Sequence, residues 1–144
     1  MSGYRGYVSS RPVAGAQYPQ SLQNSLLVSY AARVGISYKL SGTEYAMDHC
    51  HMILNQLLEE LPRLDGILFF SMYQLPAERA ARERVFERIT ALDKHAHFAL
   101  ENQRLTSVSD AQRLELMLRI SEALPLTPFA GHYSKGKPLP PLMD

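Results

Sequence analysis

The chain has 144 residues, of which 46% are hydrophobic, and its formal net charge at neutral pH is +1. This length and composition indicate one compact domain with a substantial core. The small net charge gives no electrostatic case for nucleic acid or an anionic membrane, and the apolar runs are too short to cross a bilayer. The first residues lack a signal-peptide core, and the single cysteine, Cys50, excludes an internal disulfide. We therefore expect a cytoplasmic protein.

Predicted strands and helices alternate from the beginning of the chain. Residues 4–9 are aromatic and β-branched and predict a strand. Residues 20–33 carry leucines at helical spacing, and Gly35 follows where a glycine commonly ends a helix. Residues 36–40 predict a second strand.

The middle of the chain repeats this pattern. Asp48 is placed to cap a helix whose apolar face runs over residues 52–61. Residues 66–70 form a continuous apolar run, which is typical of a central strand buried on both faces. Residues 77–92 then predict a charged helix. Its run of alternating glutamates and arginines is most simply a solvated face, although it could also contact a second subunit.

The last quarter contains one more strand and one more helix. Residues 96–100 predict the fourth strand, and Ser109 begins a helix with a capping-box spacing to Gln112. Prolines and glycines accumulate in residues 125–144, which we expect to form an irregular tail.

This order of elements predicts an α/β fold for residues 1–124. Short connections and right-handed crossovers favour a four-stranded parallel sheet flanked by helices, with the first strand inside, as in flavodoxin-like and resolvase-like proteins. Ligands of such sheets bind at the carboxyl ends of the strands. Each predicted strand ends in a polar cluster, so we expect these clusters to border one cavity. The clusters are residues 7–11, 41–45, 71–74 and 100–102.

Two residues of these clusters suggest specific chemistry. Glu44 is either an exposed glutamate or a general acid or base whose pKa is raised in a partly apolar pocket. Arg11, with Ser9 and Ser10, could hold a phosphate or a carboxylate, although turn residues and a solvated arginine are the simpler alternatives. Tyr45 could donate a phenolic hydrogen bond or simply pack.

Other candidates are weaker. Gln74 offers both a donor and an acceptor to a hydroxyl-rich ligand, whereas Asn24 faces either solvent or this edge. His49 and His51 do not share a helical face, so the sequence predicts no metal site, but either could act as a lone base near Glu44. No nucleotide-binding fingerprint is present, and we expect no cofactor. Cys50 suits a buried position better than a nucleophilic one.

Residues 4–120 resemble the catalytic domain of serine recombinases. The resemblance rests on Arg5-Gly6-Tyr7-Val8-Ser9, on Gln20 and Gln23, on residues 72–77, and on Glu101. It implies a resolvase-like fold with Ser9 at the nucleophile position. The family's cationic side chains are replaced by Tyr7, Gln74 and Ala77, and its aspartate by Tyr73. Phosphodiester attack needs positive charge on the phosphate, so the resemblance implies the fold without recombinase chemistry.

A second resemblance covers nearly the whole chain. The segments 5–7, 10–12, 23–24, 41–47 and 73–76 are similar to the sporadic carbohydrate-cluster protein family, which is encoded among bacterial surface-sugar and related biosynthetic genes. It implies a role in making or modifying an unusual sugar, without a known reaction.

We therefore expect an isomerase, epimerase or lyase that transfers a proton on a sugar or sugar-phosphate-like substrate. The alternative is a non-catalytic binding or scaffold subunit, and a DNA-binding recombinase relative is weaker; a homodimer is compatible with each. The predicted catalytic residues are Glu44, Tyr45 and Ser9. The predicted substrate-binding residues are Arg5, Tyr7, Ser10, Arg11, Asn24, Thr43, Ser71, Gln74 and Glu101.

Overall fold

The protein is described from a computed structural model, which covers residues 3–45 and 51–123. Residues 1–112 form one compact unit and residues 113–144 a second. Asp48, His49, Cys50 and the predicted tail at 125–144 lie outside the described residues. The helix α4, Val108–Ala123, crosses the boundary between the two units.

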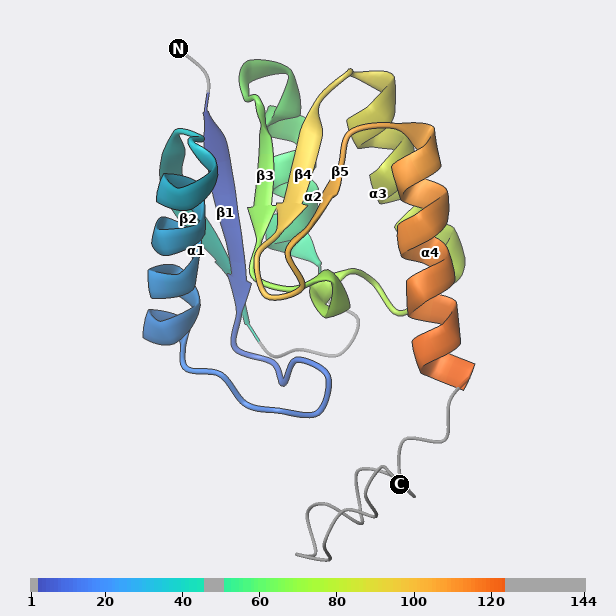
Figure 1. Cartoon of the computed structure of the whole chain (residues 1–144), viewed down its shortest axis with the longest axis horizontal. Coiled ribbons are helices and arrows are strands. Elements are labelled where there is room, and N and C mark those ends of the chain that lie inside the picture. The colour runs from blue at the N-terminus through green and yellow to red at the C-terminus, as the bar shows by residue number, and fades with distance from the viewer. Residues whose placement is uncertain (1–2, 46–50, 124–144) are drawn as a thin grey trace, which may run out of the picture. The chain divides into compact units, whose positions relative to one another are not determined.

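The first unit is built on a sheet of five strands in the order β2-β1-β3-β4-β5 (Figure 1). The first four strands are parallel, and β5 pairs antiparallel with β4. The prediction of an α/β fold with β1 inside the sheet is confirmed, whereas the prediction of four parallel strands is wrong. The strands are β1 Tyr4–Ser9, β2 Tyr38–Glu44, β3 Gly66–Phe69, β4 His95–Phe98 and β5 Gln103–Leu105.

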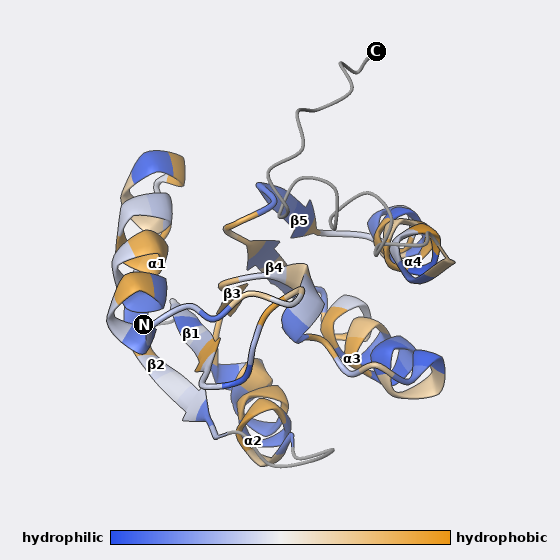
Figure 2. Ribbon diagram, turned by 90° about the horizontal axis from the view of Figure 1, so that it is seen from below, coloured by the Kyte–Doolittle hydropathy of each residue, from blue (hydrophilic) through white to orange (hydrophobic). Residues whose placement is uncertain are grey.

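Three helices of this unit cover the two faces of the sheet. Figure 2 shows α1, Gln20–Val34, on one face and α2, Met52–Glu60, with α3, Arg79–Ala91, on the other. The left-handed Gly35 ends α1 as predicted, with φ 76°. Two short 3₁₀ helices, η1 at Leu61–Arg63 and η2 at Met72–Gln74, complete the elements of the unit.

Side chains alternate between these two faces along each strand. On the α1 face, Tyr4 and Val8 pack in one cluster with Leu27 and Leu68. On the opposite face, Phe69 lies against Tyr7 with ring centroids 5.5 Å apart and stacks on Phe98 at 5.0 Å. The core of the unit is therefore divided between the two faces, and β1 contributes to both.

Several predicted boundaries are shifted. Strand β2 runs over Tyr38–Glu44 rather than over residues 36–40, so Thr43 and Glu44 belong to the strand itself. The hydroxyl of Ser107, not of Ser109, accepts the hydrogen bond from the Asp110 amide at the beginning of α4. On α3, Arg82 is buried and donates to the carbonyls of Pro76 and Ala77, so the charged run is not entirely solvated.

Candidate functional site

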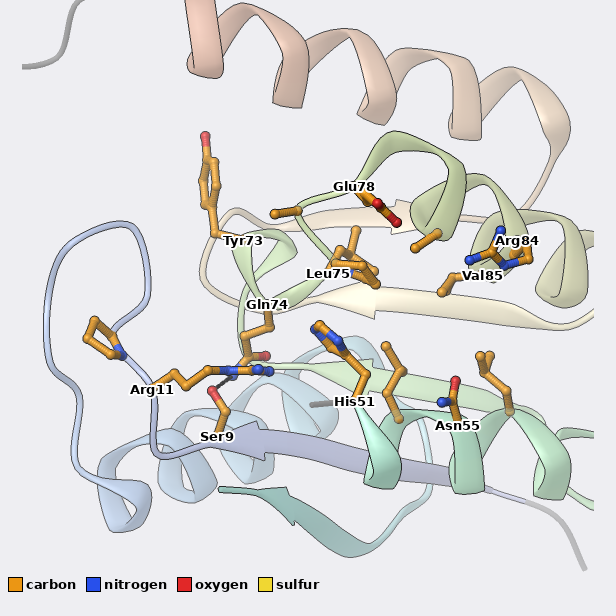
Figure 3. A pocket seen from close by; sticks show the side chains of 16 residues that line it. Ser9, Arg11, His51, Asn55, Tyr73, Gln74, Leu75, Glu78, Arg84 and Val85 are labelled. Carbon is orange, nitrogen blue, oxygen red and sulfur yellow. Dashed lines mark hydrogen bonds between the residues drawn. The ribbon is translucent and has the colours of Figure 1, made fainter. Parts of the chain in front are cut away.

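A cavity of about 780 Å³ lies where the carboxyl ends of β1 and β3 meet α2 and α3 (Figure 3). We call it the strand-end cavity. Its apolar wall comes mainly from α2, α3 and the segment after η2, including Leu54, Leu75 and Val85. Its polar and charged lining residues are Ser9, Arg11, His51, Asn55, Tyr73, Gln74, Glu78 and Arg84.

Ser9 is the last residue of β1 and is held by two buried glutamines. The Gln23 side chain accepts from the Ser9 amide at 3.0 Å and donates to the Ser9 carbonyl at 2.7 Å. The Gln74 amide nitrogen donates to the Ser9 hydroxyl at 3.3 Å and to Gln23 Oε1 at 3.1 Å. Because buried polar groups need partners, this network fixes both the end of β1 and the Ser9 hydroxyl.

Gln74 is placed by the tight turn of η2. The Ser71 hydroxyl accepts from the Tyr73 amide at 3.1 Å, while Gln74 Oε1 accepts from the Ser71 amide at 3.2 Å, which completes a capping box. Glu101 stabilises the same turn by accepting from the Ser71 hydroxyl at 2.6 Å and the Met72 amide at 2.8 Å. Ser71 and Glu101 therefore support the cavity from behind and are not among its lining residues.

Glu44 lies at the same end of the sheet, but its carboxylate is buried and used internally. It accepts from the Tyr7 hydroxyl at 2.9 Å and from the first amides of α2, those of Ile53 at 3.1 Å and Leu54 at 3.2 Å. A carboxylate at a helix N-terminus is stabilised by these amides and by the helix dipole. Burial, and then the neighbouring Glu44 carboxylate, raises the pKa of Tyr7 far above its ordinary value. Neither Glu44 nor Tyr7 lines the cavity.

Positive charge enters the cavity from two sides. Arg11 extends across it from the loop after β1 (Figure 3). The Arg11 guanidinium also donates to the Tyr7 hydroxyl at 3.4 Å. Arg84 approaches from α3 with an exposed side chain. His51, the residue before α2, projects between them from the opposite wall. The cavity therefore combines an imidazole with two guanidinium groups.

The expectation that the four strand-end clusters border one cavity is met only in part. Ser9, Arg11, Tyr73 and Gln74 line the cavity, whereas no residue of the clusters 41–45 and 100–102, including Glu44 and Glu101, does so. Thr43 pairs with Val8 and so projects from the α1 face, away from the cavity. Tyr45 is 67% exposed, and Ser10 is bound through its backbone, its amide donating to the Glu44 carbonyl. None of Ser10, Thr43 and Tyr45 lines the cavity.

Two other predicted binding residues make contacts elsewhere. Arg5 forms an ion pair with Glu60 at 2.8 Å. The Asn24 carbonyl oxygen accepts from the Ser41 hydroxyl at 2.7 Å and from the Tyr38 hydroxyl at 3.3 Å, which joins α1 to β2. Asn24 thus faces neither bulk solvent nor the cavity, which were the two alternatives open from the sequence.

The α2 and α3 sides of the cavity were largely missed from the sequence. Asn55 and Arg84 were not predicted, and His51 was considered only as a lone base. The available signal was helical spacing, since His51, Asn55 and Leu58 recur every three or four residues, as do Glu78, Ala81 and Arg84. In the described part of the chain, no three histidine, cysteine or acidic residues are grouped to hold a metal ion.

Comparisons with known proteins support the fold. No family model matches the chain, and no curated protein matches its sequence. A solved structure, the N-terminal catalytic domain of TP901-1 integrase, matches with a TM-score of 0.57 and 13% sequence identity, covering 82% of this chain and 94% of that one. The resemblance to recombinase catalytic domains is therefore confirmed at the level of a resolvase-like fold. No described helix is long and apolar enough to span a membrane.

Proposed function

We propose that the protein is an enzyme of unusual-sugar or surface-carbohydrate biosynthesis that transfers a proton on a substrate in the strand-end cavity. The reaction is of the isomerase, epimerase or lyase type, and the substrate is a sugar or sugar phosphate. The lining of the cavity carries this proposal, because it combines hydroxyl, amide, imidazole and guanidinium groups around about 780 Å³. This volume falls in the range of small-molecule sites.

The lining suggests a division of roles. Ser9 and Gln74 offer donors and acceptors for sugar hydroxyls. Arg11 and Arg84 are suited to a phosphate or a carboxylate, which guanidinium groups bind with charge-assisted hydrogen bonds. His51 is the lining group best suited to carry a proton near neutral pH. Glu44 is then a positioning residue, since its hydrogen bonds fix the first turn of α2 beside His51.

The proposal does not include DNA strand exchange. At the positions where serine recombinases carry cationic side chains, this chain has Tyr7, Gln74 and the apolar Ala77. The side chains of Tyr7 and Gln74 are buried and form internal hydrogen bonds. A covalent Ser9–DNA adduct on a denaturing gel would contradict this part of the proposal.

The test is incubation with panels of sugar phosphates, nucleotide sugars and acidic sugars in solvent deuterium, followed by NMR and mass spectrometry. We expect one class to incorporate deuterium or change structure. His51→Gln should reduce that turnover about 10²–10⁴-fold, the usual contribution of a positioned acid or base. Glu44→Gln should lower it less, and the exposed Glu59→Gln is the matched control. Unchanged turnover in His51→Gln would exclude His51 as the proton carrier.

The alternative, a non-catalytic binding or scaffold subunit, is favoured by one observation. The carboxylates of Glu44 and Glu101 are occupied by internal hydrogen bonds, which leaves His51 and Glu78 as the main lining groups that could move a proton. This alternative would be selected if a sugar binds saturably while no member of the panel is turned over. Absence of both binding and turnover would reject the carbohydrate proposal itself.

A further inference from the structure

A second cavity, of about 470 Å³, lies on the α1 face of the sheet and shares no lining residue with the strand-end cavity. We call it the tyrosine–histidine cavity; its walls include Tyr4, Tyr30, His95, His97 and Arg104. The strand register explains this grouping, because His97 pairs with Leu68 on one side and Arg104 on the other. In Figure 1, α1 lies next to β1 and β2, whereas β4 and β5 lie farther across the sheet, away from α1.

The imidazole of His97 is buried between two phenol rings. The Tyr30 hydroxyl and His97 Nδ1 are 2.7 Å apart, within hydrogen-bond distance. The Tyr4 and Tyr30 rings meet the imidazole edge-on, with centroids at 5.3 Å and 5.4 Å. His97 is thus fixed in orientation while it forms part of the cavity wall.

The charges around this cavity are predominantly positive. Arg104 lines it from β5, and the Arg33 guanidinium lies 5.0 Å from the centroid of the Tyr30 ring. Burial, followed by the charges of His95 and Arg104, lowers the pKa of His97 to about 4. Asp65 acts on this cluster through Tyr4, whose pKa is raised first by burial and then by the charge of Asp65. None of the residues lining the cavity, all of which belong to the described part of the chain, is acidic.

We propose that the tyrosine–histidine cavity binds an anionic group, a phosphate or a carboxylate carried by a small molecule. The Arg104 guanidinium supplies a charged donor, and the Asn102 side chain supplies a neutral one. The positive charges around His97 disfavour its protonated imidazole, whereas a bound anion would stabilise it. Binding of the anion and protonation of the imidazole therefore favour each other. The residues of this site are not those of the strand-end cavity, so the proposal stands whether or not the proposed function is correct.

The experiment is an NMR titration of the whole protein with sulfate, which keeps its double charge throughout the pH range in which His97 titrates. Ionic strength is matched with chloride. We expect saturable shifts of the His97 imidazole and of the Asn102, Gln103 and Arg104 amides. Sulfate should also raise the pKa of His97, and each unit of that rise means tenfold tighter binding to the protonated form. A parallel titration with acetate assigns the site to a carboxylate if acetate binds more tightly than sulfate.

Two matched variants localise the effect. Arg104→Gln removes an exposed side chain and should fold normally, as checked by its amide spectrum, but it should weaken sulfate binding at least tenfold. Arg11→Gln removes a guanidinium from the strand-end cavity and should leave these shifts unchanged. Shifts that do not saturate with either anion, that equal those in chloride, or that persist in Arg104→Gln would overturn the proposal.

Discussion

The two cavities lie on opposite faces of one sheet and are built in different ways. In the strand-end cavity, the buried Gln23 and Glu44 and the half-buried Glu101 stand behind the lining and hold it through hydrogen bonds. In the tyrosine–histidine cavity, the buried titratable groups Tyr4, Tyr30 and His97 are themselves part of the wall. The difference teaches that the buried carboxylate supports the first cavity without lining it, whereas the buried titratable groups of the second also form its surface.

The largest expected effect tests the support of the strand-end cavity. Gln23→Leu leaves the Ser9 amide and carbonyl and the Gln74 side chain without their partner. Each buried polar group left unpaired costs about 1–3 kcal/mol, so the loss of these contacts should lower the free energy of unfolding by about 3 kcal/mol or more. The exposed Gln17→Leu is the control and should change it by less than about 1 kcal/mol. Urea unfolding at neutral pH measures both, and equal stabilities would show that the network does not support the fold.

The second prediction concerns acid and the tyrosine–histidine cavity. The pKa of His97 falls from its ordinary 6.5 to about 4 in the folded protein, so folding favours the neutral imidazole. This contribution to stability is complete above about pH 6.5 and is lost as the pH falls toward 4, to a limit of about 3 kcal/mol. Urea unfolding at about pH 7 and about pH 4.5 should show a smaller loss in His97→Gln than in the wild type. Identical losses of stability in the two proteins would show that His97 does not cause the acid sensitivity.

The smallest effect on stability is expected from a residue that contacts ligand without supporting the fold. Arg84→Gln alters an exposed side chain and should change the free energy of unfolding by less than about 0.5 kcal/mol. It should nevertheless weaken binding of a sugar phosphate in the strand-end cavity several-fold, as NMR titration would measure. Arg79→Gln, on the same helix but outside the cavity, is the matched control. Equal affinities of the two variants for the sugar phosphate would show that Arg84 does not contact the ligand.

The sequence predicted the fold from its hydrophobic pattern but missed one strand. The apolar run at Gly66–Phe69 and the aromatic and β-branched segment at Tyr4–Ser9 carry enough local signal to be recognised as strands. Strand β5 has only three residues, Gln103–Leu105, and is defined by its pairing with β4 rather than by a pattern of its own. Such a strand depends on tertiary contacts that periodicity does not record.

The same limit applies to the candidate site. The ends of the strands correctly located Ser9, Arg11 and Gln74 at one cavity. Polar residue types alone do not reveal whether a side chain faces a ligand or an internal donor. Glu44 is at the predicted end of the sheet, yet its carboxylate is taken by the Tyr7 hydroxyl and by backbone amides of α2. That choice depends on how the first turn of α2 packs against the end of β2, which the hydrophobic pattern does not show.

The turn between β4 and β5 joins the two cavities covalently. Glu101 holds η2 behind the strand-end cavity, and the next residue, Asn102, adopts a left-handed conformation at φ 54° and lines the tyrosine–histidine cavity. A ligand that displaced this turn from one face would therefore also act on residues that shape the other cavity. By thermodynamic reciprocity, any resulting change in affinity at one cavity is matched by an equal change at the other.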